Sequence, residues 1–578
     1  MSVFTWTDEE VKVAEGVVRV LEEAGIDLVF GMSGGNVKFF FDALIDHQSK
    51  IRTILVRHES LAGVMAEVYG RLTGKPGVAI GQGAFMLCNS LLGVLEGHLG
   101  SSPMLLIADV SDNAPFTHHA PYQAGTGDYG TWDAKVSFSG VTKATFLFQD
   151  PVQAIQGTQM GIKHAMTGEC GPVALLYHSS VFRDKVRPSE PPLLYPTSLY
   201  LPKALQGADE REVLKAAKVV SGAEFPVIIA GNGVRLSGAY GALQELAETL
   251  GAPVATTAAG KGVFPENHDL ALGVFGTFGT SVANKLIGNA DAIVFVGTKI
   301  SPTDTANENP LLLDPRRQKM VQIDIEPKNA GWTFPCEQVL VGDAKTVLNQ
   351  LVNALEELGA PSTEICRGRK NRVLLSRKEL GFFNTSGFFS DEIPMLPERV
   401  IWELRQVVAD DSLIACDAGE NRLFMTHFFQ TRSPNSFISP ASVGGMGYAI
   451  PAALVAKLLY PDRQVVAVCG DGGFGMAFGG MITASEENIP IVTVIFNNQA
   501  LGWVYHGQGG RTIASRFKDV NYADMAKAAG CVGYHVESPS QFRQALGEAL
   551  NNQEPAVLDV RISLKTTFRD VKSSLAIG

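Results

Sequence analysis

Two oxygen-bearing side chains each follow an apolar run of the chain. Asp471 comes after the run at residues 465–469, and Asn498 comes after the run at 491–496. Continuous apolar runs are typical of parallel strands buried on both faces, so both side chains should leave one sheet at its carboxyl edge, where open α/β sheets bind ligands. Magnesium usually takes one or two protein carboxylates and completes its shell with phosphate oxygens and water. The pattern therefore predicts a magnesium ion that holds a diphosphate.

Glycines surround Asp471 on both sides. Gly470, Gly472 and Gly473 let backbone amides come close to a phosphate, and a helix expected after Gly475 would point its positive end at it. The alternative is an ordinary strand-to-helix turn with an aspartate cap. The polar residue at the matching end of the second strand favours the cofactor site.

The segments GDGGFGM at residues 470–476 and FNNQALG at 496–502 resemble the fingerprint of thiamine diphosphate (ThDP) enzymes. The whole chain resembles the acetolactate-synthase-like branch of that family. The resemblance implies that Mg2+ is held by Asp471, Asn498 and the backbone carbonyl of Ala500. It also implies cofactor contacts from four stretches of the chain, formed by Gly419, Glu420 and Asn421, by Gly445 and Met446, by Gly470, Gly472, Gly473 and Phe474, and by Leu501 and Gly502.

Met446 matches the large apolar residue that holds the cofactor in its bent shape, although a methionine there could also fill a gap in the core. Glu420 is an unusual neighbour for a phosphate. We expect its side chain to point elsewhere or to bond a backbone amide.

Glu59 follows the strand expected at residues 53–56 and opens the helix expected at 60–73. An acid at this place can simply complement the helix dipole. By resemblance, however, the pattern Arg57-His58-Glu59 matches the family's activating glutamate, which hydrogen-bonds the cofactor's pyrimidine so that its amino group can deprotonate the thiazolium carbon. Gln123 matches a family glutamine near the reacting centre.

The residues expected around the substrate are Gly35, Asn36, Phe85, Met86 and Trp503. The loop expected at 84–89 is bulky and apolar where the synthases have small residues, and Gly507 stands where they have a tryptophan. These departures leave the substrate open. His118, His119 and His506 could carry protons, although histidines in loops are more often solvated.

Alternating apolar runs and helical patterns predict an α/β protein with three doubly wound, parallel-sheet domains. The N-terminal pyrimidine-binding domain is expected at residues 1–186, a central Rossmann-like domain at 205–357 and the diphosphate-binding domain at 393–578. A proline-rich linker occupies 187–203, and residues 358–392 are charged and loop-like. The outer domains form a weak internal repeat. The basic tail at 564–578 is either a lid over a site or a frayed terminus.

The central domain has a turn, Gly231-Asn232-Gly233, that follows an apolar run. A dinucleotide fingerprint would need another glycine where Leu236 stands, so a structural turn is favoured over bound FAD or ADP. The resemblance allows either nucleotide or neither.

The composition limits the function classes. With 578 residues the chain exceeds one core, and we expect about two to four domains. A net charge of -11 disfavours nucleic acid or an anionic membrane as a partner, because both select basic patches. The start of the chain has no signal-peptide pattern, and we expect a cytoplasmic protein. Seven scattered cysteines indicate neither a disulfide framework nor a metal site.

Together these features predict a ThDP- and Mg2+-dependent carbon-carbon lyase or carboligase that acts on a small molecule, a 2-oxo acid or 2-hydroxy ketone. A 2-hydroxyacyl-CoA lyase is the alternative, favoured by the basic tail and disfavoured by Gly34-Gly35-Asn36. A non-catalytic scaffold would not need Glu59, Asp471 and Asn498. Because Glu59 and Asp471 lie in different domains, the resemblance implies a homodimer or homotetramer with active sites at the subunit interface.

Overall fold

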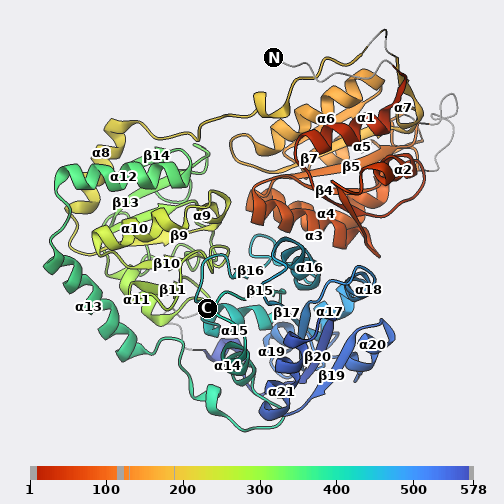
Figure 1. The fold of residues 1–578 in the computed structure, drawn as a ribbon. Helices are drawn as coiled ribbons and strands as arrows, with labels where there is room; N and C mark the ends of the chain where they lie inside the picture. The colour runs from red at the N-terminus through yellow and green to blue at the C-terminus, as the bar shows by residue number, and fades with distance from the viewer. Residues whose placement is uncertain (1–8, 113–122, 129, 188, 190, 572–578) are drawn as a thin grey trace. The chain divides into compact units, whose positions relative to one another are not determined.

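The computed structural model describes residues 9–112, 123–128, 130–187, 189 and 191–571. His118 and His119 lie outside the described residues. The chain forms two compact units, one of residues 1–204 with 454–456 and the other of the remainder. Figure 1 colours the chain from red at its N-terminus to blue at its C-terminus.

The first unit is built on a six-stranded parallel sheet in the order β3-β2-β4-β5-β7-β6. Helices α1, α2, α6 and α7 bury apolar side chains against one face of this sheet. Helices α3 and α4 pack against each other. The elements are β2 (Leu28–Gly31), β3 (Arg52–Leu55), β4 (Gly77–Gln82), β5 (Met104–Val110), β6 (Ala144–Phe148), β7 (Pro172–His178), α1 (Val13–Glu23), α2 (Lys38–Leu44), α3 (Glu59–Thr73), α4 (Gly83–Gly100), α5 (Ala134–Ser139), α6 (Pro151–Met166) and α7 (Ser179–Arg183), with 3-10 turns at Ile45–His47 and Thr197–Leu199.

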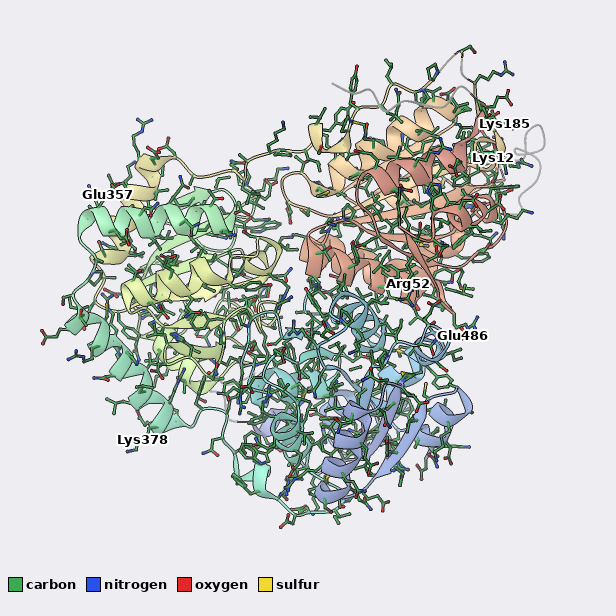
Figure 2. All side chains as sticks on the ribbon, in the orientation of Figure 1. Lys12, Arg52, Lys185, Glu357, Lys378 and Glu486 are labelled. Carbon is green, nitrogen blue, oxygen red and sulfur yellow. The ribbon has the colours of Figure 1, made fainter. Side chains whose placement is uncertain are left out.

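The first unit also contains a short antiparallel pair of strands. Strand β1 (Val11–Lys12) pairs with β8 (Lys185–Val186), so Lys12 lies opposite Lys185, and Figure 2 shows both lysines at the surface. Their ammonium groups pair with Asp42 at 3.5 Å and Glu10 at 3.1 Å, which offsets the like charges across the pair.

The second unit contains two six-stranded parallel sheets. The central sheet has the order β11-β10-β9-β12-β13-β14, which is the Rossmann order. Its elements are β9 (Pro226–Ala230), β10 (Val254–Thr256), β11 (Ala271–Val274), β12 (Ala292–Val296), β13 (Lys319–Asp324), β14 (Gln338–Val341), α8 (Glu210–Ser221), α9 (Asn232–Leu236), α10 (Tyr240–Leu250), α11 (Ser281–Gly288), α12 (Ala344–Leu358) and α13 (Thr363–Leu380).

The last sheet has the order β16-β15-β17-β18-β20-β19. Helices α14, α15 and α21 bury apolar side chains against one of its faces. The elements are β15 (Leu413–Cys416), β16 (Phe437–Ile438), β17 (Val465–Gly470), β18 (Val492–Asn497), β19 (Val532–Val536), β20 (Ala556–Arg561), α14 (Pro397–Val407), α15 (Glu420–Phe428), α16 (Ala449–Leu459), α17 (Asp471–Ala477), α18 (Gly479–Glu486), α19 (Gly502–Gly507), α20 (Tyr522–Ala528) and α21 (Pro539–Asn551), with 3-10 turns at Ser386–Phe389 and Phe568–Asp570.

The first and last sheets share one topology. If β15 is matched to β2 and each later strand to its counterpart, the two strand orders are identical, whereas the central sheet differs. The structure therefore confirms the predicted α/β class and the predicted repeat of the outer domains.

Three local predictions were wrong. Residues 358–392 are not a loop, because α13 occupies most of the segment; Ser362 caps it, and its only described buried residues are Arg369, Val373 and Ser376. A helix with so little apolar face gives a weak pattern. The helix predicted after Gly475 already begins at Asp471. Residues 84–89 lie within α4 rather than in a loop.

Buried polar contacts join the central and last sheets. The Lys261 ammonium pairs with Glu266 at 2.7 Å, and both side chains are almost fully buried. Glu266 also accepts a hydrogen bond from the backbone amide of Thr431 at 2.8 Å. Arg235 donates to the carbonyl oxygen of Phe437 at 2.9 Å. Because these groups are paired out of water, breaking one contact would leave its partner unsatisfied, so the two sheets are held in one arrangement.

Candidate active site

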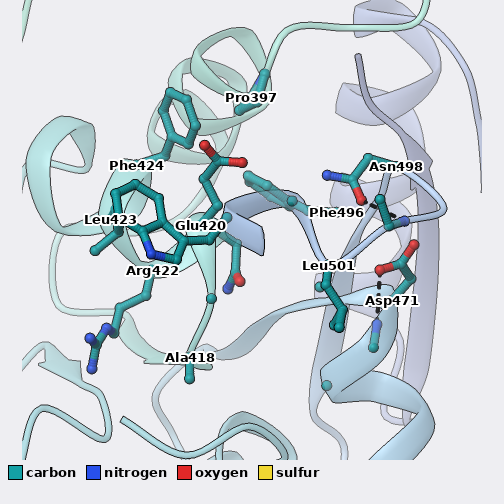
Figure 3. A pocket seen from close by; sticks show the side chains of 18 of the residues that line it. Pro397, Ala418, Glu420, Arg422, Leu423, Phe424, Asp471, Phe496, Asn498 and Leu501 are labelled. Atoms are coloured by element: carbon teal, nitrogen blue, oxygen red, sulfur yellow. Dashed lines mark hydrogen bonds between the residues drawn. The ribbon is translucent and has the colours of Figure 1, made fainter. Parts of the chain in front are cut away.

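A cavity of about 330 Å³ opens at the carboxyl edge of the last sheet, where the strand order reverses between β15 and β17. Figure 3 shows its wall, with Asp471 and Asn498 at the ends of neighbouring strands and Glu420 and Phe424 on α15. All the cofactor-contacting residues predicted from the sequence line this cavity except Gly445, which lies between the lining residues Gly444 and Met446, and Phe474, which is fully buried in the core.

Asp471 provides a carboxylate oxygen without a partner. The side chain is 2% exposed, and Oδ1 accepts a hydrogen bond from the backbone amide of Gly472 at 2.8 Å. Oδ2 is buried and accepts no hydrogen bond from any described residue. Burial raises the pKa of Asp471 to about 6. A buried carboxylate oxygen without a donor is costly unless a cation compensates it, so this oxygen fits a bound metal ion.

Asn498 lies beside it on the next strand end. Its Oδ1 accepts a hydrogen bond from the backbone amide of Ala500 at 3.1 Å, and Ala500 itself lines the cavity. Within the part of the chain that the structure describes, no three His, Cys, Asp or Glu side chains come together as a metal cluster. An ion held by one carboxylate, one amide oxygen and one carbonyl would still need ligand oxygens, which suits Mg2+ with a diphosphate.

The glycines of the site allow close backbone approach. A Cβ atom on Gly473 would lie 2.5 Å from Oδ2 of Asp417, and one on Gly502 would lie 2.6 Å from Oε2 of Glu420. A Cβ on Gly472 would lie 2.9 Å from the terminal methyl of Met446. Real Cβ contacts are longer than these distances, so side chains at 473 and 502 would displace the acids that they face.

Asp417 was not predicted as a site residue. It follows β15, is 1% exposed, and accepts hydrogen bonds from the backbone amides of Gly447 at 2.9 Å and Tyr448 at 3.2 Å. Burial raises the pKa of Asp417 to about 6. By holding these two amides it fixes the loop that carries Met446 into the cavity. An acid directly after a buried strand was the available signal in the sequence.

Glu420 behaves as predicted, because it bonds a backbone amide. Its Oε1 accepts hydrogen bonds from the amide of Phe568 at 2.9 Å and from the hydroxyl of Thr567 at 2.7 Å. Its Oε2 lies 2.9 Å from Nδ1 of His506, whose Nε2 lies 3.0 Å from the carbonyl oxygen of Leu564. His506 is therefore part of a network that ties the tail to α15, and is not a solvated loop histidine.

Several lining residues could not be foreseen because they come from distant parts of the chain. Phe278 belongs to the central sheet's part of the unit, and Pro397 lies at the start of α14. Ile562, Ser563 and Thr566 follow the last strand. The cavity wall is thus assembled from segments whose proximity depends on the packing of the whole unit.

In the first unit, Glu59 opens α3 at the carboxyl edge of its sheet and is 9% exposed. The side-chain amide of Asn89 on α4 donates to its Oε2 at 2.8 Å. Gln123 lies in a turn with φ +56°. Asn89 therefore orients the glutamate, a role that the sequence alone did not assign.

The residues predicted around the substrate have different surroundings. The Asn36 side chain donates to Oγ of Ser179 at 2.8 Å, and a Cβ on Gly35 would lie 2.2 Å from the Gln82 side chain. Phe85 is 41% exposed, whereas Met86 is fully buried. Trp503 is half-buried and lines the cavity of the second unit.

The turn Gly231-Asn232-Gly233 of the central sheet packs tightly against neighbouring residues. A Cβ on Gly233 would lie 2.6 Å from Cα of Gly297, so the two glycines serve the packing of adjacent turns. The Arg235 guanidinium donates to backbone carbonyls of Ala259 and Lys261 at 3.0 and 2.9 Å. These contacts fit the predicted structural turn.

Three sequence models of one protein family match the chain. They are described as the thiamine pyrophosphate enzyme N-terminal TPP binding domain, central domain and C-terminal TPP binding domain, and they match residues 11–126, 213–351 and 417–560. The chain belongs to the thiamine pyrophosphate enzyme family.

Its relatives include acetolactate synthases. The chain is 32% identical, over 95% of its length and 92% of the relative's, to a Methanococcus aeolicus protein named "Probable acetolactate synthase large subunit". It is 29% identical to the acetolactate synthase large subunit of Corynebacterium glutamicum, over 94% and 86% of the two chains. It is also 29% identical to the Escherichia coli acetolactate synthase isozyme 3 large subunit, over 95% and 94%.

The last two observations concern the cysteines and the helices. All seven cysteines are free. None of the described helices is both long and apolar enough to cross a membrane.

Proposed function

We propose that the protein is a ThDP- and Mg2+-dependent enzyme that makes or breaks a carbon-carbon bond in a 2-oxo acid or 2-hydroxy ketone. The observation that carries this proposal is the unpartnered, buried Oδ2 of Asp471 at the edge of the cavity, beside Asn498. When bound, ThDP supplies a carbon nucleophile that adds to a carbonyl group and accepts the electron pair released when the adjacent carbon-carbon bond breaks.

The residues of the second unit would bind and shape this cofactor. Asp471 and Asn498 would hold Mg2+ with the carbonyl of Ala500. The amides of Gly472 and Gly473 lie at the start of α17, where backbone donors and the helix dipole favour a phosphate. Met446, fixed through Asp417, would support the ring system of the cofactor.

Glu59 would assist proton transfer at the pyrimidine ring of the cofactor. Asn89 engages Oε2 of the carboxyl group, so Oε1 is the atom that we assign to the pyrimidine nitrogen of the cofactor. A carboxyl group at that nitrogen would hold a proton there and increase the basicity of the amino group that deprotonates the reacting carbon. The apolar lining formed by Phe278, Phe424 and Phe496 would exclude water during the reaction.

We further propose that each active site is formed by two copies of the chain. Glu59 belongs to the first unit and Asp471 to the second, and each unit has exposed apolar side chains that a partner could cover. They include Leu55 and Phe85 in the first unit and Met476, Val504, Ile513 and Phe517 in the second.

A mixing experiment tests the shared site. Glu59→Gln and Asp471→Ala variants are each expected to be inactive, and refolding or exchanging them together should restore activity. Random pairing would give half heterodimers, each with one intact site, so about a quarter of the parent activity should return. If the mixture stays inactive although subunits exchange, the site does not combine the first unit of one chain with the second unit of another.

The reaction itself is tested by turnover. Purified protein with ThDP and Mg2+ should convert one or more 2-oxo acids or 2-hydroxy ketones, and mass spectrometry should identify the products. The same screen with acyl-CoA thioesters tests the alternative lyase. Absence of any ThDP-dependent product, in protein that binds ThDP, would contradict the proposed activity.

A further inference from the structure

Arg569 is an exposed cation that lies against a residue lining the cavity. Its guanidinium lies 4.0 Å from the ring centre of Trp503, and Trp503 lines the cavity. Among the described residues, no carboxylate pairs with this guanidinium and none of its N–H groups has a recorded hydrogen bond; only the backbone amide of Arg569 is bonded, to Thr567.

The position of Arg569 is set by its neighbour. Phe568 is 1% exposed, and its ring lies 6.0 Å from that of Phe278 and 5.6 Å from that of Phe424, centre to centre. Both of those rings line the cavity. The buried ring of Phe568 therefore holds this stretch of the tail against the cavity wall, and it fixes the backbone position of Arg569, the next residue.

Glu420 is the acid that contacts this part of the tail, and it already has hydrogen-bond partners. Glu420 accepts hydrogen bonds from Thr567 and Phe568, and its other oxygen faces His506. The two ring nitrogens of His506 face two acceptors, the Glu420 carboxylate and the Leu564 carbonyl. Both carboxylate oxygens of Glu420 thus have partners other than Arg569.

Gly507 leaves the room that the guanidinium occupies. A Cβ atom at this position would lie 3.2 Å from Nη2 of Arg569, so the guanidinium would have to shift to make room for a side chain there. Stacking on an aromatic face uses the flat side of a guanidinium and leaves its edge donors available for a planar anion such as a carboxylate, or for a phosphate.

We propose that Arg569 is a specificity-determining residue that binds an anionic group of the substrate, a carboxylate or a phosphate, beside Trp503. This inference rests on the proposed function, since it assigns the substrate class of the same site. The neutral part of the substrate would then lie in the apolar cavity, and its charge would lie on the guanidinium edge. A charge-assisted hydrogen bond of this kind changes affinity by roughly 10- to 100-fold.

Steady-state kinetics with a charged and an uncharged substrate provide the first test. Pyruvate carries a carboxylate, and 2,3-butanedione is similar in size and uncharged. In Arg569→Gln, kcat/KM for pyruvate should fall roughly 10- to 100-fold, mainly through KM, while the value for butanedione stays near that of the parent. Lys565→Gln is the matched control, because Lys565 is on the same tail but pairs with Glu392 at 2.7 Å. Equal losses for both substrates would overturn the proposal, and so would no loss for pyruvate together with no response to coenzyme A in the binding test that follows.

A binding test does not depend on turnover. Titration with pyruvate or with coenzyme A at constant ionic strength should change the tryptophan fluorescence, and the response should disappear in Trp503→Phe and in Arg569→Gln. A response to pyruvate alone assigns the anion as a carboxylate, and a response to coenzyme A alone assigns it as a phosphate. A response that persists in Arg569→Gln, or no response to either anion in the parent, would refute the proposal.

Calorimetry separates this inference from the proposed function. If the parent binds no ThDP and turns over no substrate, the proposed function fails, and the fluorescence titration still decides whether Arg569 binds an anion. If the parent is active and Arg569→Gln binds ThDP normally but treats pyruvate and butanedione as the parent does, the inference alone fails.

Discussion

Adding one methyl group at Gly473 should damage the candidate cofactor site, whereas the same change at Gly475 should not. The new Cβ at 473 would lie 2.5 Å from Oδ2 and 3.0 Å from Cγ of Asp417. Asp417 cannot easily retreat, because the backbone amides of Ala418, Gly447 and Tyr448 all donate to it. Relieving the clash must therefore shift the start of α17, which carries Asp471. Overpacking of this kind typically costs about 1–3 kcal/mol.

Gly475 is the matched control, because it lies on the same helix and a Cβ there would meet nothing within 4 Å. Replacing a glycine inside a helix by alanine stabilises it by about 0.5–1 kcal/mol. Because both glycines lie in α17, this gain applies to both variants, and their free energies of unfolding should differ by the cost of the clash alone, roughly 1–3 kcal/mol.

Denaturant unfolding of the two variants measures this difference, and calorimetric titration with ThDP and Mg2+ measures its effect on the site. Gly473→Ala should bind ThDP more weakly than the parent, and Gly475→Ala should bind it equally well. Two variants of equal stability and equal ThDP affinity would show that the contact between Gly473 and Asp417 does not fix the helix start.

Three further predictions concern other residues. Glu59→Gln should still bind ThDP but turn over roughly 10²- to 10⁴-fold more slowly, and NMR should show slower hydrogen-deuterium exchange at the thiazolium carbon; exchange as fast as in the parent would exclude the assigned role. Phe85→Ala should broaden the range of accepted substrates with little loss of stability, because Phe85 is 41% exposed, whereas Met86→Ala should cost about 2–5 kcal/mol because Met86 is fully buried. An unchanged substrate profile in Phe85→Ala would place that side chain outside the pocket. Burial lowers the pKa of His427 from 6.5 to about 4, so the unfolded chain binds a proton more readily than the folded chain. The contribution of His427 to the free energy of unfolding should be full above pH 6.5 and fall by at most about 3 kcal/mol as the pH drops to 4. The free energy of unfolding of His427→Phe should fall less over that range.

The parts of the site that could be predicted from the sequence are those that depend on local pattern. Asp471 and Asn498 each follow a buried strand, and strands β17 and β18 are neighbours in the sheet, so their spacing along the chain was enough to bring them to one edge. The place of Glu59 could be predicted for a similar reason, since it stands between a strand and a helix; its activating role stays a prediction.

The parts that could not be predicted depend on long-range packing. Phe278 and Phe568 reach the cavity region only because the central sheet, the last sheet and the tail pack as one unit. Most of the fold could be predicted from the sequence. Helix α13 was missed because few of its residues are buried, so its apolar pattern is weak. The acid at position 420 looked out of place in the sequence because its partners, Phe568 and His506, are far from it along the chain.

The central claim is that Asp471 holds the metal through which the cofactor binds, and isothermal titration of Asp471→Ala with ThDP in the presence of Mg2+ tests it most directly. We expect no detectable binding at ThDP concentrations that saturate the parent, because the ion would link the protein and the diphosphate. Asp524→Ala, which removes a carboxylate that is 64% exposed on α20, should bind as the parent does. ThDP affinity that is unchanged in Asp471→Ala, with Mg2+ present, would contradict the claim.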